Sequence, residues 1–307
     1  MQNRKHRLFL IFFLLTIINT IISIKRDEFA YQPYRSYDDL YRKCDAACVL
    51  KWQQFNLSYP PEEYEQISQI LKEKQIIQKD SNTLQQVLKI ASFLQRSFSD
   101  QKGTPSADFL SLSPLKQFYA LNQTNIKLWC GNFAVLLNYF CGAAGITSRY
   151  IEIFNDTNHH VLNECYIPEL KRWVMVDVYS NLLLVQNDKL EYLDLQRFME
   201  QARKNDSFIY IGVKNDSLHH SPFQYDHPEF DLNYNIHANS PVYYFYQIDL
   251  NTVYSTSNKI KRYFSTNSWY EIYSKENRGN YKFYVKLFMF IVWILTSIGW
   301  LFSLIKR

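Results

Sequence analysis

Two hydrophobic runs without a charged residue lie near the ends of the chain, at residues 8–24 and 287–304. Each comes close to the ~20 apolar residues that a membrane-spanning helix needs. Trp293 and Trp300 in the second run fit this interpretation, because tryptophan is enriched at membrane interfaces. The pattern predicts two membrane helices, with a long segment of mixed polarity between them.

Basic residues outside the two runs indicate how the chain crosses the membrane. Residues 4, 5, 7, 306 and 307 are Lys or Arg, and all lie on the terminal side of a run. The positive-inside rule then places both termini in the cytoplasm and the middle of the chain outside it. The basic residues that count against this orientation are Lys25, Arg26, Arg278 and Lys282.

The first run has a second interpretation, a signal peptide that is cleaved off. Its basic start is typical of such a peptide, but residues 20–25 contain no small-residue cleavage site. An uncleaved membrane anchor is therefore favoured.

Between the runs, the first half of the chain has helical periodicity. Apolar residues recur at helical spacing over residues 37–51, 64–71 and 84–94. Pro60 and Pro61 interrupt the pattern, and a Gly- and Pro-containing loop follows at residues 99–113. We expect a helical region that supports the rest of the chain, with binding of a partner as the alternative role.

The second half has more strand character. Residues 208–213 and 242–248 are rich in β-branched and aromatic side chains, and residues 190–202 have a helical pattern. The expected division is an anchor or signal peptide at 1–26, a helical support at 27–113, a central core at 114–213, a strand-rich extension of that core at 214–280, and a membrane helix at 281–307.

Cys130 begins an apolar helical run that ends at Gly142 or Gly145. A helix N-terminus stabilises an anionic thiolate, so a cysteine there is a candidate nucleophile. A packed core thiol is the simpler interpretation of this residue taken alone. Cys141 lies roughly 16 Å further along the same helix, too far for a disulfide with Cys130, and is expected in the core.

Two short strands follow around a turn at Pro168. If residues 167–170 form the loop, His160 lies directly opposite Asp177, and the Cβ atoms of opposed residues are ~5 Å apart. His159 would point to the other face, because side chains alternate along a strand. The pattern therefore selects His160 as the neighbour of Asp177.

These residues together predict a Cys–His–Asp site. Cys130 would act as the nucleophile, His160 would take its proton and pass it to the leaving group, and Asp177 would hold the imidazole. Each has a plainer interpretation: a core thiol, a half-buried histidine and a residue at a strand end. Their order and spacing favour the functional interpretation of the set.

Four short motifs carry a family resemblance, namely Cys130 at a helix start, Gly145-Ile146-Thr147-Ser148-Arg149, His160-Val161-Leu162-Asn163-Glu164 and Trp173-Val174-Met175-Val176-Asp177. The stretch resembles the transglutaminase-like core of the papain-like cysteine enzymes. Leu162 and Thr147 stand where that family usually has tryptophan and proline. The resemblance implies an α+β fold in which the nucleophile helix packs on an antiparallel sheet that carries His160 and Asp177.

The resemblance also implies thiol chemistry on amide bonds through an acyl-enzyme. Water as the acceptor gives a protease or amidase, and an amine gives a cross-linking acyltransferase. A hydrolase is favoured, because no acidic cluster typical of a calcium site stands out and because short membrane-bound chains with this core resemble hydrolytic or uncharacterised members. A non-catalytic scaffold is the third alternative.

The oxyanion hole of such an enzyme has several candidate donors in this sequence. They are the Cys130 backbone N–H and the side chains of Trp129, Gln117, Gln123 and Asn125. Arg149 is interpreted as an ion-pair partner, with Glu164 as the proposed acid.

Composition and charge narrow the partners. A net charge of +5 without a dense basic stripe argues against nucleic acid, and 7 glycines argue against a Gly-rich phosphate loop. Neither a metal nor a cofactor is expected, because four histidines after residue 213 fit no tight ligand pattern: His219, His220, His227 and His237. The expected partners are a membrane and a protein or peptide substrate.

The five cysteines leave at least one thiol without an intramolecular partner in an oxidising compartment. Cys44 and Cys48 form either a local disulfide or two packed thiols. N-x-S/T motifs that would permit glycosylation in a eukaryotic secretory pathway stand at Asn56, Asn122, Asn155, Asn205 and Asn215.

Overall fold

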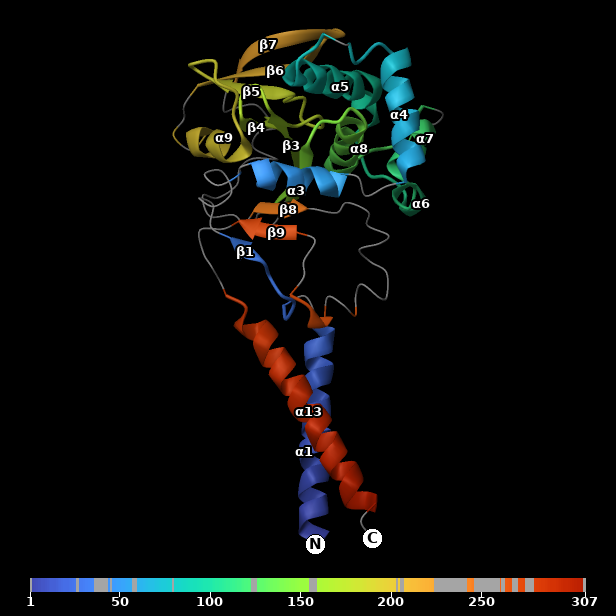
Figure 1. Cartoon of the computed structure of the whole chain (residues 1–307), viewed down its shortest axis with the longest axis vertical. Coiled ribbons are helices and arrows are strands. Elements are labelled where there is room, and N and C mark those ends of the chain that lie inside the picture. The colour runs from blue at the N-terminus through green and yellow to red at the C-terminus, as the bar shows by residue number, and fades with distance from the viewer. Residues whose placement is uncertain are drawn as a thin grey trace. The chain divides into compact units, whose positions relative to one another are not determined.

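A computed structural model describes residues 2–25, 28–35, 44, 46–56, 60–78, 80–122, 126–154, 159–202, 204, 207–223, 242–245, 260, 263–266, 270–273 and 279–305. The chain divides into two compact units (Figure 1). The first, here called the anchor unit, consists of Met1–Tyr34, Tyr254–Ser268 and Asn277–Arg307. The second, here called the core unit, consists of Arg35–Val253 and Trp269–Glu276.

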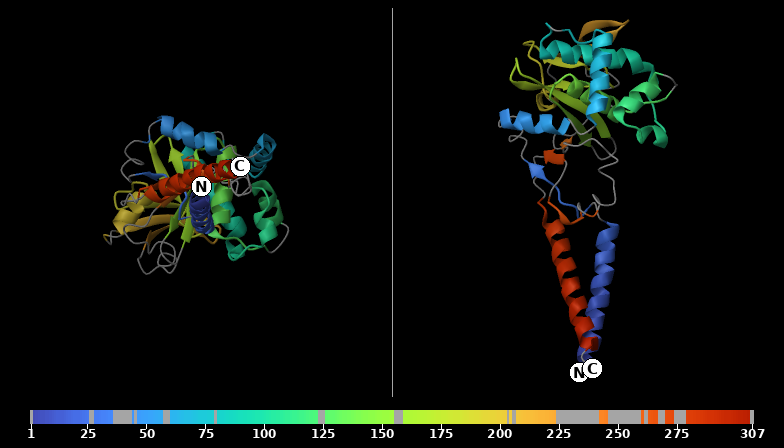
Figure 2. Two further views of the ribbon diagram at one scale, coloured as in Figure 1. Left: turned by 90° about the horizontal axis from the view of Figure 1, so that it is seen from below. Right: turned by 45° about the vertical axis from the view of Figure 1, so that its right-hand side comes forward.

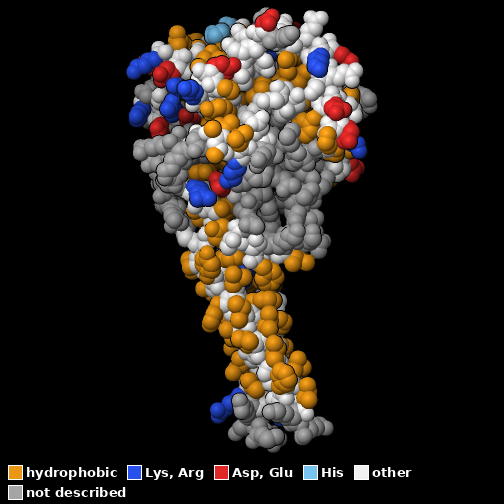
Figure 3. Space-filling model, in the orientation of Figure 1, with side chains coloured by type: hydrophobic (Ala, Val, Ile, Leu, Met, Phe, Trp, Pro, Cys, Tyr) orange, Lys and Arg blue, Asp and Glu red, His pale blue; other side chains and the backbone are white. Residues whose placement is uncertain are grey.

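Two long helices make up most of the anchor unit, α1 (Gln2–Ile24) and α13 (Tyr281–Ile305). Residues Lys5–Ile24 and Tyr281–Ile305 are each long and apolar enough to cross a membrane. On the face that Figure 3 shows, hydrophobic side chains predominate along this pair, as contact with lipid would require. Both predicted segments are therefore helices, while their passage through a membrane stays a prediction.

The two long helices pack on each other. Trp293 Nε1 donates a hydrogen bond to Thr16 Oγ1 at 2.9 Å, and the rings of Phe12 and Trp300 stack with their centroids 5.4 Å apart. The start of α1 and the end of α13 lie at the same end of the pair (Figure 2). If both helices cross a membrane, their outer ends therefore emerge on one side.

The strands form two sheets. The six-stranded sheet has the order β1-β9-β8-β2-β3-β4 and comprises β1 (Tyr34–Arg35), β2 (Ser148–Phe154), β3 (His159–Ile167), β4 (Arg172–Val176), β8 (Val242–Phe245) and β9 (Tyr270–Tyr273). The three-stranded sheet comprises β5 (Leu184–Asn187), β6 (Phe208–Lys214) and β7 (Ser217–Phe223) in that order. Within the larger sheet, β9, β8, β2, β3 and β4 pair antiparallel. With the helices beside them, these sheets confirm the α+β class.

The helices of the core unit begin where local chemistry allows. They are α3 (Ala46–Asn56), α4 (Pro61–Glu73), α5 (Thr83–Phe98), the short 3-10 helix η1 (Ser99–Gln101), α6 (Ala107–Leu110), α7 (Pro114–Leu121), α8 (Cys130–Ala143) and α9 (Leu195–Ala202). Asn82 caps α5 by accepting a hydrogen bond from the Gln85 N–H at 2.9 Å, and Gln85 returns the contact to the Asn82 N–H. Proline opens α4 and α7, since the first helical N–H needs no intrahelical partner.

Some elements differ from the sequence-based expectation. The helix expected at 190–202 begins only at Leu195, because the Asp194 carboxylate accepts from the Arg197 N–H at 2.8 Å and caps it there. The second part of the helix expected at 37–51 is the start of α3, which begins at Ala46. Residues 36–43 and 45 lie outside the described residues.

Residues 217–223, whose histidines were expected in a loop, form a strand. Asn215 and Asp216 have φ values of 49° and 57°, the left-handed conformation that a tight hairpin turn requires. They join β6 to β7, and β7 carries His219 and His220. His227 and His237 lie outside the described residues. Among the described residues, no cluster of His, Cys, Asp and Glu side chains could hold a metal ion.

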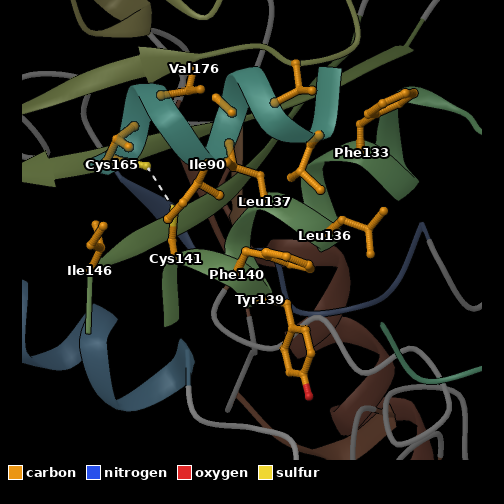
Figure 4. Close-up of a cluster of buried hydrophobic side chains, with 14 of the residues drawn as sticks. Ile90, Phe133, Leu136, Leu137, Tyr139, Phe140, Cys141, Ile146, Cys165 and Val176 are labelled. Carbon is orange, nitrogen blue, oxygen red and sulfur yellow. Dashed lines mark hydrogen bonds between the residues drawn. The ribbon is translucent and has the colours of Figure 1, made fainter. Parts of the chain in front are cut away.

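Helix α8 is central to the larger hydrophobic core. It packs against α4, α5 and α7 and against β3, with Leu137 and Phe140 fully buried (Figure 4). Cys141 on α8 and Cys165 on β3 meet in this core with their sulfur atoms 3.9 Å apart. The predicted place of Cys141 in the core is confirmed. The helices over residues 61–98 share this core with α8 and the sheet.

The cysteines give a first testable prediction. Cys44 and Cys48 form a disulfide, whereas Cys130, Cys141 and Cys165 are free thiols. We predict that the denatured, unreduced chain takes up three equivalents of iodoacetamide and five after reduction, which intact-mass spectrometry counts directly. One equivalent before reduction would contradict this by showing Cys141 joined to Cys165, and five would show that Cys44 and Cys48 are unbonded.

Candidate active site

Cys130 is the first residue of α8 and its side chain is partly exposed. The N-cap residue is Trp129, whose side chain forms no capping hydrogen bond. The N–H groups in the first turn of a helix have no partner within the helix, and together they carry a partial positive charge. An anionic sulfur or oxygen at Cys130 therefore lies in a favourable field.

The β3–β4 hairpin does not have the expected register. Ile167 pairs with Arg172, so the connection is residues 168–171 rather than 167–170. Asn163 pairs with Val176 at the other end of the ladder, which puts Leu162, not His160, opposite Asp177. The expectation of a directly opposed His160 and Asp177 is wrong by two positions. Because this shift is even, both side chains still point to the same face.

His160 and Asp177 nevertheless meet as diagonal neighbours on that face. His160 Nε2 lies 2.7 Å from Asp177 Oδ2, and the two side chains are only 3% and 1% exposed. The other carboxylate oxygen, Asp177 Oδ1, accepts from the Ser180 N–H at 3.0 Å, so the carboxylate is fixed at both ends. A diagonal pair is within reach of a ring side chain.

His159 faces the other way, as the alternation predicted. Its side chain is 49% exposed, and its Nδ1 lies 2.9 Å from Glu152 Oε1. An exposed histidine on the opposite face of the strand cannot reach Asp177. The structure thus brings together the histidine and the aspartate that the sequence paired, and separates the neighbouring histidine from them.

Cys130 completes the group. Its side chain lies close enough to His160 to help raise the pKa of that imidazole. Since Nε2 is taken by Asp177, Nδ1 is the ring nitrogen left to exchange a proton with the sulfur. The imidazole is thus influenced by both a thiol and a carboxylate, and the ring can exchange a proton with the sulfur while the carboxylate holds it.

The electrostatics of His160 follow from the same contacts. Burial lowers the pKa of this imidazole, but the charge and the hydrogen bond of Asp177 outweigh burial, and Cys130 adds to their effect. The net result raises the pKa of His160 to about 10. At neutral pH the ring is therefore an imidazolium, a proton donor and a counter-ion for a sulfur anion.

Tyr179, which no sequence pattern selected, lies against this group, and Lys102 lies against Tyr179. The ring of Tyr179 is 6.2 Å from the ring of His160 and 5.9 Å from that of Phe133. Lys102 Nζ lies 5.0 Å from the centroid of Tyr179. Tyr179 follows Asp177 by two positions, which was the one available signal, whereas Lys102 comes from a distant segment.

The weaker oxyanion candidates have different positions. Trp129 is 46% exposed beside Cys130. Gln117 is buried and hydrogen-bonded to Asn132, and Gln123 and Asn125 lie outside the described residues. Tyr150, which no sequence pattern indicated, lies next to the first turn of α8, where its hydroxyl would be 3.3 Å from a Cβ added to Gly131.

Arg149 and Glu164 form the predicted ion pair. Arg149 Nε donates to Glu164 Oε2 at 2.8 Å, and both side chains are fully buried. The guanidinium lies 3.9 Å from the ring centroid of Trp173 and 4.4 Å from that of Tyr244. Glu164 Oε1 also accepts from the Leu195 N–H at 2.8 Å, which ties the start of α9 to β3. The structural role expected for Arg149 is confirmed.

This pair yields a stability prediction. Arg149→Met leaves the Glu164 carboxylate buried without its cation and should lower the free energy of unfolding by about 3–5 kcal/mol. The double variant Arg149→Met, Glu164→Gln removes the uncompensated charge and should recover part of that loss. Chemical denaturation of the full chain in detergent measures both. Equal stability of the single variant and the wild type would contradict the prediction.

Residues 71–178 match the family model described as the Transglutaminase-like superfamily. The matched range begins in α4 and contains α8, β3, β4 and Asp177. It therefore includes Cys130, His160 and Asp177.

Two individual proteins resemble parts of the chain. A peptide-N(4)-(N-acetyl-beta-glucosaminyl)asparagine amidase of Arabidopsis thaliana is 38% identical over 71 residues, a match that covers 21% of this chain and 9% of the plant protein. A solved structure of a cysteine-protease candidate from Cytophaga hutchinsonii is 17% identical, covers 45% of this chain and 44% of that chain, and has a TM-score of 0.31. This chain thus spans less than half the length of either protein.

Proposed function

Because residues 71–178 match the model of the Transglutaminase-like superfamily, we propose that the chain is a membrane-anchored cysteine hydrolase that cleaves peptide or amide bonds outside the cytoplasm. The observation that carries the proposal is the buried His160–Asp177 hydrogen bond beside Cys130 at the start of α8. A histidine with a purely structural role in the core would need neither an ionised partner on one side nor a partly exposed thiol on the other.

The proposed reaction has two halves. The Cys130 sulfur attacks the carbonyl carbon, and the amine leaves with a proton from His160 Nδ1, which gives a thioester. Water then attacks the thioester while Nδ1 takes a proton from it, and the sulfur leaves as the acid product departs. Asp177 stays ionised throughout and stabilises the imidazolium.

The negative oxygen of each tetrahedral intermediate needs hydrogen-bond donors. The backbone N–H of Cys130, at the positive end of α8, is the first proposed donor. The Tyr150 hydroxyl and the Trp129 indole N–H are the proposed second donors, since both lie beside the first turn of α8. Tyr150→Phe and Trp129→Phe remove one donor each without emptying the site.

Hydrolysis is preferred over cross-linking because Cys130 is partly exposed, so water can reach the thioester. The two outcomes separate in one assay. A peptide library is incubated with the full chain, with and without a primary amine, and products are identified by mass spectrometry. Incorporation of the amine ahead of hydrolysis would favour the acyltransferase, and neither product would favour the scaffold.

The extracytoplasmic location rests on two supports. The outer ends of α1 and α13 lie at one end of their pair (Figure 2), and Cys44–Cys48 is a disulfide, a bond typical of oxidising compartments. A reporter fused to either terminus should be active only in the cytoplasm. A terminal reporter exposed on the outer side would contradict the proposed topology.

Thiol labelling tests the enzyme proposal itself. Cys130 should react with iodoacetamide at pH 6–7, well below the pH of about 8.5 at which a free thiol ionises. His160→Ala should remove this early reactivity, and Cys130→Ala should remove the labelled peptide. A Cys130 that reacts only above about pH 8 would sink the enzyme proposal.

A further inference from the structure

We propose that Asn132 and Gln117 are positioning residues for the nucleophile: they hold the first turn of α8 so that the sulfur of Cys130 meets His160. The proposal rests on the proposed function, because it concerns the same thiol. It replaces the expected role of Gln117 as an oxyanion donor.

A chain of three hydrogen bonds carries the argument. The Trp129 N–H donates to Asn132 Oδ1 at 3.1 Å, Asn132 Nδ2 donates to Gln117 Oε1 at 3.3 Å, and Gln117 Nε2 donates to the Leu112 carbonyl at 3.0 Å. Asn132 and Gln117 are each only 6% exposed. The chain therefore runs through the interior, from the backbone next to Cys130 to the backbone before α7.

The start of α8 needs hydrogen bonds from other residues because its N-cap residue is Trp129. A Ser, Thr, Asp or Asn at the N-cap would accept from an N–H of the first turn, but a tryptophan ring has no acceptor. Asn132, at the third helical position, instead accepts from the N-cap N–H, which is one half of a capping box. The Asn132 bond thus fixes the path of the backbone at the helix start. No side-chain oxygen at the N-cap then competes for the first-turn N–H groups, which remain available to stabilise an anion at Cys130.

Gln117 sets the orientation of Asn132. The two ends of an asparagine amide differ, since one accepts and the other donates. The Leu112 carbonyl requires the NH2 end of Gln117, so Gln117 presents its oxygen to Asn132. Asn132 must then turn its NH2 toward Gln117 and its oxygen toward Trp129. Each amide fixes the next, and the last one fixes the backbone beside the nucleophile.

Two substitutions break this chain at different points. Asn132→Leu removes both side-chain bonds at the helix start, and Gln117→Met removes the orienting partner at nearly equal volume. A small displacement of a reacting group costs roughly 10- to 100-fold in rate. The double variant should be no slower than Asn132→Leu alone, because both residues act on one path.

Asn138 supplies a matched control. It is a second buried asparagine of α8, also 6% exposed, and its Oδ1 accepts from the Ser148 hydroxyl. Asn138→Leu breaks a buried hydrogen bond of the same helix, two turns away from Cys130. It should lower the melting temperature without changing the reactivity of the thiol.

The experiment measures iodoacetamide labelling of Cys130 by peptide mass spectrometry between pH 5 and 9, on the full chain in detergent. We expect Asn132→Leu and Gln117→Met to label roughly 10- to 100-fold more slowly than wild type at pH 7, with the pH midpoint moved toward that of a free thiol near 8.5. Asn138→Leu should keep the wild-type profile.

Several results would overturn the inference. Folded Asn132→Leu and Gln117→Met with a wild-type pH profile would show that the bonds only stabilise the fold. An equal change in Asn138→Leu would show general loosening of α8. If Asn132→Leu does not fold, Gln117→Met alone decides. A wild type without early reactivity is a different failure, because it removes the proposed function and not this contact chain alone.

Discussion

Asp177→Asn should lower the rate of the proposed amide hydrolysis by about 10³- to 10⁴-fold and leave the fold intact. The carboxylate is the partner of His160 Nε2 at 2.7 Å, and an amide in its place carries no charge. In the wild type, the Asp177 carboxylate outweighs the effect of burial on the pKa of His160. In the variant, burial dominates, so the pKa of His160 falls. The ring then no longer enters the reaction as an imidazolium held in one orientation.

The fold should survive because an asparagine oxygen can still accept from the Ser180 N–H, as Asp177 Oδ1 does at 3.0 Å. Glu152→Gln is the matched control. It makes the same change of charge beside the exposed His159, 2.9 Å away, and should alter the rate by less than about twofold. Similar rates for Asp177→Asn and Glu152→Gln would remove His160 and Asp177 from the mechanism.

The stability of the chain should fall as the pH rises from about 6.5 to about 10. The pKa of His160 is raised to about 10 in the folded chain, whereas an unfolded histidine has a pKa near 6.5. Below about pH 6.5 both states bind the proton, and the stabilisation by Asp177 is fully present. Between the two values only the folded state binds it, so each further rise in pH favours unfolding.

The size of this effect has an upper bound. A difference of about 3.5 between the two pKa values corresponds to about 5 kcal/mol. Chemical denaturation of wild type and His160→Gln is measured at pH 6, 8 and 9.5. The difference between the two proteins isolates the contribution of this ring, because the other titrating groups are present in both proteins. The stability advantage of the wild type should shrink with pH. An advantage that stays constant or grows would contradict the raised pKa of His160.

The sequence was most informative where chemistry and periodicity coincide. The uncharged terminal runs predicted α1 and α13, and the apolar run after Cys130 predicted α8 with the thiol at its first residue. The alternation of side chains separated His160 from His159, because that property survives any even error in register. Arg149 and Glu164 were paired correctly, since two buried opposite charges require one another.

The sequence failed where long-range contacts decide. The hairpin register depends on Ile167 staying in the β3–β4 ladder, and the turn is then closed at Lys171 with a φ of 51°. No local pattern required a lysine in that conformation. The contact of Asn132 with Gln117, and that of Tyr179 with Lys102, join separate elements and left no periodic signal.

The most direct measurement of the central claim is the capture of an acyl group on Cys130. The full chain is incubated with a p-nitrophenyl ester, quenched in acid at short times and analysed by intact-mass and peptide mass spectrometry. The account predicts one acyl group per chain, on Cys130, which water removes with time and which does not form in His160→Ala. An acyl group that forms equally in His160→Ala, or that never forms on Cys130, would contradict it.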